Sequence, residues 1–174
     1  MKNQMNMLFS KNPKIGLNCV ISNDVIIGNN VIIGNHCIIS GTVKIGDNTE
    51  LKNFIELRDG TVIGNNCLID SRVTSSGNCT IGNDVVLRYG TIVARGCVIE
   101  DNCYFSPRVM TNNLNTEKDQ IGGPKFGKNT FVGTNAVIHH GLKIGKNVKI
   151  GAMSFVNTDC EDNSVYFGIP AKKK

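Results

Sequence analysis

A six-residue repeat constrains the fold of this chain more than any other feature of its sequence. Read in sixes from Ile15, the first position of each six is apolar as far as Phe105, with Ser75 the single exception, and Thr111 ends the run. The fifth position carries mostly small or β-branched residues, and Gly often fills the second. Because six is a multiple of two, the large residues all point to one side of a strand. The period predicts short strands joined by corners and stacked into a solenoid.

The repeat is interrupted once. After Thr111 the next clean start is Phe126, fifteen residues later, which is not a multiple of six. The intervening segment 117–125 is polar and contains Gly122-Gly123-Pro124, which predicts a loop extruded from a corner. Insertions in solenoids tend to lie on the binding face, so we expect a functional loop, with an ordinary surface loop as the alternative.

By length the chain is predicted to form a single domain, residues 1–174. Beyond the second run of sixes, Tyr166, Phe167 and Ile169 are expected to cap the open end of the solenoid. The expected segments are a lead-in or cap (1–14), coils (15–116), the loop (117–125), further coils (126–161), and a C-terminal cap and tail (162–174).

The seven cysteines fall on the fifth position of their sixes, which predicts core packing rather than disulfides. No C-x-x-C is present, and we expect no metal site. The net charge of +5 is compatible with a small anionic ligand but is not evidence for nucleic acid. No apolar run has the length of a membrane span, and the start does not resemble a signal peptide, so we expect a cytoplasmic protein. The cysteines are Cys19, Cys37, Cys67, Cys79, Cys97, Cys103 and Cys160.

The segments Ile27-Gly28-Asn29-Asn30 and Ile63-Gly64-Asn65-Asn66 resemble the hexapeptide repeat of left-handed parallel β-helices. This resemblance implies an all-β fold in which three sixes make a triangular coil of eighteen residues. Coils of that length would align Lys52, Asp70 and Arg88 in one column, where opposite charges should pair.

Three further segments resemble hexapeptide-repeat acyltransferases: residues 127–138, the closing residues 162–172, and Thr111-Asn112-Asn113. The last is similar to the T-N-D that precedes the loop in bacterial nucleotide-amino-sugar N-acetyltransferases. The resemblance implies an acetyl-CoA-dependent N-acetyltransferase that acts on a UDP- or dTDP-linked amino sugar, as a homotrimer with active sites between subunits. The chain departs from the pattern at Leu114-Asn115-Thr116, where Pro-Arg is usual, and at Ile169, where Asn is usual.

On this interpretation, Arg95, Asn112 and Asn113 beside the loop would bind the sugar nucleotide. Acetyl-CoA would run along the coils after the loop, where small residues let its pantetheine approach the backbone and Lys172 attracts its phosphates. The small residues are Gly133, Thr134, Gly151 and Ala152.

His139 and His140 are the candidate general bases, with solvated surface histidines as the alternative. An amine acceptor is already a good nucleophile, so a protein base can be dispensable. A hydroxyl acceptor would need one, as in a sugar O-acetyltransferase of the same fold. Because His139 and His140 are adjacent and His36 is remote, a three-His zinc site is not expected. A structural β-helix without catalysis is the alternative from a different functional class.

Overall fold

The computed structural model describes residues 12–119 and 122–174, and every regular element in these residues is a β-strand. Strands β1 to β23 are each two residues long, and each ends on the first position of its six. The described residues contain no helix long and apolar enough to cross a membrane. Most of the expected lead-in, residues 1–11, lies outside the described residues.

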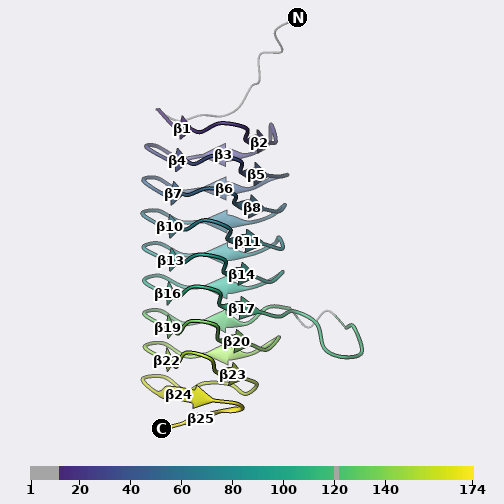
Figure 1. The fold of residues 1–174 in the computed structure, drawn as a ribbon, viewed down its shortest axis with the longest axis vertical. Coiled ribbons are helices and arrows are strands. Elements are labelled where there is room, and N and C mark those ends of the chain that lie inside the picture. Colours follow the sequence, from purple (N-terminus) through teal and green to yellow (C-terminus); the bar gives the residue numbers. More distant parts are fainter. Residues whose placement is uncertain (1–11, 120–121) are drawn as a thin grey trace, which may run out of the picture.

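The strands form three sheets, which are the three sides of a prism (Figure 1). From one edge to the other, the ten-stranded sheet contains β1 (Lys14–Ile15), β4 (Ile32–Ile33), β7 (Glu50–Leu51), β10 (Leu68–Ile69), β13 (Val86–Leu87), β16 (Tyr104–Phe105), β19 (Phe131–Val132), β22 (Lys149–Ile150), β24 (Val165–Gly168) and β25 (Ala171–Lys173). The eight-stranded sheet contains β2 (Val20–Ile21), β5 (Ile38–Ile39), β8 (Glu56–Leu57), β11 (Thr74–Ser75), β14 (Ile92–Val93), β17 (Met110–Thr111), β20 (Val137–Ile138) and β23 (Phe155–Val156). The seven-stranded sheet contains β21 (Lys143–Ile144), β18 (Lys125–Phe126), β15 (Val98–Ile99), β12 (Thr80–Ile81), β9 (Val62–Ile63), β6 (Lys44–Ile45) and β3 (Ile26–Ile27).

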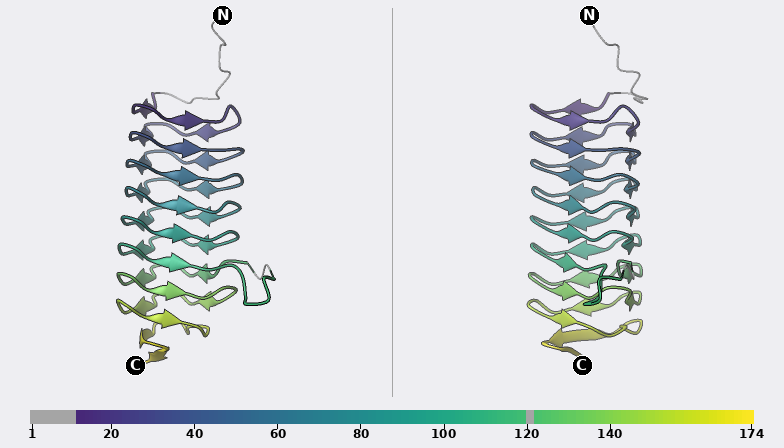
Figure 2. Two further views of the ribbon diagram at one scale, coloured as in Figure 1. Left: turned by 45° about the vertical axis from the view of Figure 1, so that its right-hand side comes forward. Right: turned by 90° about the vertical axis from the view of Figure 1, so that its right-hand side faces the viewer.

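Strand pairing confirms the coil of eighteen residues and the parallel direction, and the fold is the expected left-handed parallel β-helix. Lys14 pairs in parallel with Ile32, eighteen residues on, and the same offset recurs in the following coils. Across the interruption the offset becomes 27, as between Val98 and Lys125, so the chain inserts nine residues there. Figure 1 and Figure 2 show this insertion leaving the prism as one loop between β17 and β18.

The core is the inside of the prism, where the first and fifth positions of the sixes stack. All seven cysteines are free thiols, and six are buried as expected, while Cys19 is half-buried in the first described coil. Burial raises the pKa of Cys103 to about 11 and that of Cys160 to about 12. These thiols are therefore uncharged packing groups near neutral pH.

The three corners of the prism have different sequences. We call the corner between the seven- and ten-stranded sheets the asparagine corner, because each described coil places Asn or Asp there at positive φ. Asn and Asp tolerate this conformation better than other residues with a Cβ. The side chains also bond from coil to coil, with Asn48 Nδ2 3.3 Å from Asn66 Oδ1. The residues are Asn12, Asn30, Asn48, Asn66, Asp84, Asn102, Asn129, Asn147 and Asn163.

We call the corner between the ten- and eight-stranded sheets the mixed corner, because large side chains occupy the same positive-φ position there. His36, Phe54 and Arg72 are successive examples. The His36 and Phe54 rings stack with their centroids 5.1 Å apart, and the Arg72 guanidinium lies 5.2 Å from the Phe54 centroid. Stacking and cation–π contacts therefore run along the outside of this corner.

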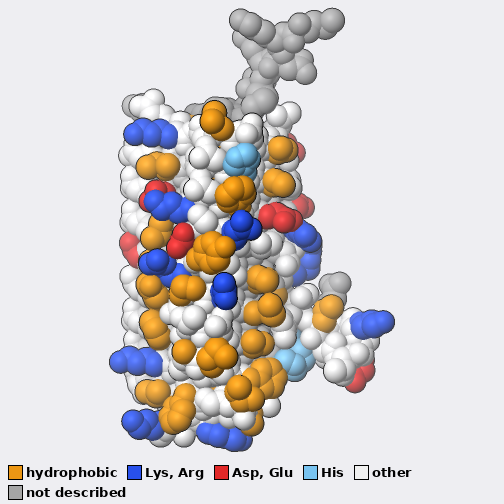
Figure 3. All heavy atoms as spheres, viewed as in Figure 1, with side chains coloured by type: hydrophobic (Ala, Val, Ile, Leu, Met, Phe, Trp, Pro, Cys, Tyr) orange, Lys and Arg blue, Asp and Glu red, His pale blue; other side chains and the backbone are white. Residues whose placement is uncertain are grey.

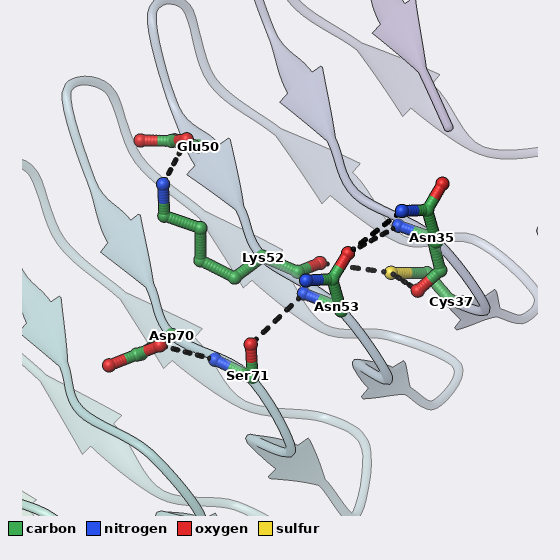
Figure 4. Close-up of polar contacts among 7 residues, drawn as sticks. All are labelled: Asn35, Cys37, Glu50, Lys52, Asn53, Asp70 and Ser71. Atoms are coloured by element: carbon green, nitrogen blue, oxygen red, sulfur yellow. Dashed lines mark hydrogen bonds and ion pairs between the residues drawn. The ribbon is translucent and has the colours of Figure 1, made fainter. Parts of the chain in front are cut away.

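The expected charge column is only half confirmed. Arg88 lies 3.2 Å from Asp70, one coil away, as expected. The expected pairing of Lys52 with Asp70 is wrong, because Lys52 bonds instead to Glu50, two residues earlier in the same coil (Figure 4). Asp70 is occupied by Arg88 and by the backbone N–H of Ser71, at 2.7 Å.

A hairpin closes the C-terminal end of the prism. Strand β24 continues the parallel stack, and β25 then pairs with β24 in the antiparallel direction. Tyr166 is buried, as expected of a cap, but Phe167 and Ile169 are exposed, so their expected capping role is wrong. Phe167 alternates with Tyr166 along β24 and therefore faces outward.

Candidate functional site

The loop is tied to the prism at its base. The backbone N–H of Gly123 donates to the Arg95 carbonyl at 2.9 Å, and that of Gly122 donates to the Asn113 carbonyl at 3.2 Å. The N–H of Gly141, one coil further on, donates to the Gly122 carbonyl at 2.9 Å. We call this corner, between the eight- and seven-stranded sheets, the loop corner. These bonds fix both legs of the loop against the residues on either side of it.

A groove of about 320 Å³ lies on the eight-stranded sheet beside the base of the loop. Its floor includes Ser76, Ala94 and Asn112, which occupy the same column in successive coils. The small side chains of Ser76 and Ala94 leave the hollow, and Asn112 provides an amide at the end nearer the C-terminus. The lining residues are Ser76, Ile92, Ala94, Met110, Thr111, Asn112, Asn113 and Leu114.

The two histidines continue these columns in the next coil. The Asn112 N–H donates to the Ile138 carbonyl at 3.0 Å, so His139 follows Asn112 in its column and His140 follows Asn113. The two imidazole centroids are 4.0 Å apart, and the His139 ring meets the edge of Phe155 at 5.8 Å. Burial first, and then the neighbouring His140, lower the pKa of His139. His139 is therefore neutral near pH 7 and able to accept a proton.

Glu117 on the loop lies within electrostatic range of His140, a contact that the repeat does not predict. A hydrogen bond from the Thr116 hydroxyl, at 2.8 Å, is the main cause that lowers the pKa of Glu117, and the charge of His140 adds to it. The His140 Nδ1 atom is buried and has no hydrogen-bond partner among the described residues. The loop thus contributes a carboxylate to the surroundings of the histidine pair.

Arg95 occupies the expected position directly above Asn113, but its side chain turns away from the loop. A Cβ added to Gly77, one coil nearer the N-terminus, would lie 3.2 Å from Arg95 Nη2. The charge of Arg95 also contributes to the lowered pKa of Asp59, whose main cause is a hydrogen bond from the Thr42 backbone. The guanidinium therefore borders the preceding coils rather than the histidine pair.

Four of the five residues predicted to bind acetyl-CoA, all except Lys172, lie at the mixed corner, across the eight-stranded sheet from the histidines. A Cβ on Gly133 would lie 2.7 Å from the carbonyl carbon of Gly151, so the next coil already requires Gly at that position. Thr134 and Ala152 are exposed there, and Lys172 is exposed on β25. The structure thus brings together Asn112, Asn113 and the histidines, and separates them from the predicted cofactor residues.

Two family models match the chain. Residues 3–113 match the model described as the GMPPB C-terminal domain, and residues 123–158 match the bacterial transferase hexapeptide (six repeats). No curated protein matches the sequence significantly.

Several solved structures share the fold at low sequence identity. A UDP-N-acetylglucosamine acyltransferase has a TM-score of 0.79 at 21% identity, over 97% of this chain and 71% of that one. LpxA from Acinetobacter baumannii has a TM-score of 0.67 at 22% identity, over 90% and 72%. PerB from Caulobacter crescentus, in complex with CoA and GDP-perosamine, has a TM-score of 0.51 at 21% identity, over 92% and 58%. The chain therefore has the fold of hexapeptide-repeat acyltransferases.

Proposed function

The chain belongs to the GMPPB C-terminal domain family and carries the bacterial transferase hexapeptide repeat, and we propose that it is an acetyl-CoA-dependent N-acetyltransferase acting on a nucleotide-linked amino sugar. The observation that carries the proposal is the one loop that interrupts the repeat. Its tied base holds a groove with Asn112 at one end, directly followed in the next coil by His139. A UDP- or dTDP-linked sugar is the expected acceptor.

The reaction needs little from the protein beyond positioning. The lone pair of the neutral amine attacks the thioester carbonyl carbon, forms the C–N bond and leaves an oxyanion. Collapse of this intermediate breaks the C–S bond and releases CoA as the thiolate, and the proton lost by the amine passes to His139 or to water. His139 suits this role because its lowered pKa keeps it neutral. Asn112 and Asn113 would hold the sugar, and the loop would limit the access of water.

We further propose a homotrimer whose subunits cover the apolar outer surface of the C-terminal coils. Phe131 on the ten-stranded sheet is 41% exposed and stacks on Tyr104, with centroids 5.6 Å apart. Met110 on the eight-stranded sheet is 41% exposed, and Met153 at the mixed corner between the two sheets is 60% exposed. Hydrophobic side chains gather on this side of the molecule in Figure 3. Clustered exposed hydrophobic side chains of this kind are typical of a subunit interface. Sedimentation equilibrium measures the mass of the assembly.

A sugar O-acyltransferase of the same fold is the second candidate, favoured by the histidine pair, since a hydroxyl acceptor requires a base. A thiol-release assay separates the candidates. Acetyl-CoA is incubated with UDP-, dTDP- and GDP-linked amino sugars and with the matching sugars that carry a hydroxyl in place of the amine. We expect thiol release with an amino sugar only. Turnover of the hydroxyl compounds would favour the O-transferase, and no turnover together with no CoA binding would favour a structural β-helix.

A further inference from the structure

Two lysines face each other on the outside of the seven-stranded sheet, just after the loop. Lys125 on β18 and Lys143 on β21 are register partners in adjacent parallel strands, and both side chains are exposed. Adjacent strands lie about 4.8 Å apart, and like charges directly opposite each other destabilise a sheet. Neither ammonium group has an ion-pair partner among the described residues.

The nearby carboxylates are engaged with other groups. Asp162 accepts the backbone N–H of Lys146 at 2.9 Å and lies 3.7 Å from its ammonium group. Glu100 accepts the backbone N–H of Lys128 at 3.1 Å. Asp159 likewise accepts the backbone N–H of Lys143, at 2.8 Å. The charges of Lys125 and Lys143 are thus left without the carboxylate contacts that Lys128 and Lys146 have.

The lysine pair lines a groove of about 380 Å³, within the range of small-molecule sites. Gly127 and Gly145, in successive coils, also line it, and a Cβ on Gly127 would lie 2.7 Å from the backbone nitrogen of Lys146 in the next coil. Apart from these glycines and the lysine pair, the lining residues are Val98, Glu100, Phe126, Ile144, Lys146 and Asp162.

On strands β18 and β21, the lysine pair is the part of this groove nearest the loop corner. Lys125 directly follows the loop, and Lys143 lies three residues after His140. Three residues of extended chain span at most about 11 Å. A ligand whose phosphates rest on the lysine pair would therefore reach the histidines with the rest of its length.

We propose that Lys125 and Lys143 form a diphosphate-binding subsite for a nucleotide-containing substrate. A diphosphate carries negative charge on several adjacent oxygens, so it can bond to both ammonium groups and remove the repulsion between them. This proposal rests on the proposed transferase function, because it names the face on which one of the two substrates lies. CoA and a nucleotide sugar both contain a diphosphate, and the experiment distinguishes them.

Lys44 provides a matched control. It occupies the same outward position on the same sheet, on β6, but its register partners are Ile26 and Val62, so no second lysine lies opposite it. If Lys125 and Lys143 were only solvated surface residues, replacing them should change ligand affinity no more than replacing Lys44 does.

The test is calorimetric titration of the folded protein with CoA, with UDP and GDP, and with inorganic pyrophosphate. The variants are Lys125→Gln with Lys143→Gln, and Lys44→Gln as the control. We expect the Kd of at least one probe to rise at least about tenfold in the double variant, because charge-assisted contacts are lost, and to stay unchanged in the control. A rise confined to CoA assigns the subsite to the acyl donor, and a rise confined to UDP or GDP assigns it to the sugar nucleotide.

Unchanged affinity of every probe in the double variant would overturn the proposal, as would the absence of binding to the unaltered protein at millimolar concentration or equal losses in both variants. Lysine-dependent binding without turnover in the thiol-release assay would instead refute the transferase and leave the anion subsite standing. Circular dichroism and melting temperature confirm that each variant is folded.

Discussion

The two corners that flank the seven-stranded sheet both contain residues at positive φ, but they use different residue types there. At the asparagine corner each described coil uses Asn or Asp at positive φ, and side chains bond from one coil to the next, as Asn48 does to Asn66. At the loop corner the turn is often made by glycine, as at Gly60, Gly96 and Gly141. A glycine turn meets the conformational demand without contributing side chains to a ladder.

The difference separates the corner with the side-chain ladder from the corner with the candidate site. A corner bonded through its side chains cannot accept an insertion without breaking the bonds to both neighbouring coils. The loop corner has fewer such bonds, and the nine extra residues emerge there with the pairing of the strands on either side intact. The groove and the histidine pair lie at this corner as well.

Deleting residues 114–122 should produce the largest effect. The deletion removes nine residues, restores the offset of eighteen and places Gly123 opposite Gly96. We expect a folded protein whose kcat/KM is lower by at least about 100-fold, since substrate positioning is lost. Circular dichroism and the thiol-release assay measure the two quantities. An unfolded product would show that the loop corner is as structural as the asparagine corner.

Asn66→Ala should have the opposite effect to the loop deletion, lowering stability and leaving activity unchanged. Ala at a φ of 56° lacks both the tolerance of Asn and the ladder bond, so we expect a loss of about 1–2 kcal/mol in the free energy of unfolding. Asn66→Gly, which relieves the backbone but also loses the bond, should cost less. Denaturant unfolding measures both, and kcat should be unchanged. Equal losses for Ala and Gly would place the stabilisation in the ladder bonds alone.

Replacing His139 and His140 together by Asn tests the chemistry at the loop corner. With an amine acceptor we expect kcat to fall by about tenfold or less, equivalent to about 1.4 kcal/mol, because positioning supplies most of the rate. A hydroxyl acceptor predicts a loss of about 10²–10⁴-fold. The melting temperature should change little, since both side chains are only half-buried. A thousandfold loss in a folded protein would reject the amine.

The pH dependence should show the smallest effect. The lowered pKa of His139 means that its neutral, proton-accepting form persists below the usual value of about 6.5 and is lost only at lower pH. We therefore expect kcat/KM to fall as the pH decreases through that range, and this fall to be absent in His139→Asn. The ionisation of the substrate amine affects both proteins equally. Identical profiles for the two proteins would remove His139 from the reaction.

The sequence was sufficient for the fold because one rule repeats along it. A period of six puts the first-position side chain of each six inside from Ile27 onward, although Ile26, Ile32 and Ile38, one residue before first positions, are exposed. Strand pairing follows the same register coil by coil. The coil length of eighteen residues predicted the position of Arg95 above Asn113. It did not predict the direction of the Arg95 side chain, which lies near Gly77 and affects the pKa of Asp59 in earlier coils. Glu117 could not be found, since a loop has no period from which to place its residues.

The repeat also predicts the lysine pair and the outward position of Phe54, but it does not predict the groove beside Asn112. Lys125 and Lys143 are eighteen residues apart, so the coil length alone places them side by side. Phe54 occupies a positive-φ corner position, and the other two corners have Asn, Asp or Gly at such positions. A large aromatic residue at a corner faces outward, so the corner positions alone predict that Phe54 makes a contact on the outside of the prism. The groove beside Asn112 is different, because it results from Ser76 and Ala94 being small relative to their neighbours. Such hollows depend on atomic packing and not on residue pattern.

The closing hairpin ends the parallel stack of coils. A repeat does not by itself terminate the solenoid, since each coil presents to the next one the same parallel row of backbone donors and acceptors. Strand β25 reverses direction against β24 and presents antiparallel spacing in place of that row. The parallel stack ends there, so a few residues outside the repeat fix the distance from the loop to the last coil of the prism, and with it the length of coil surface beside the candidate site.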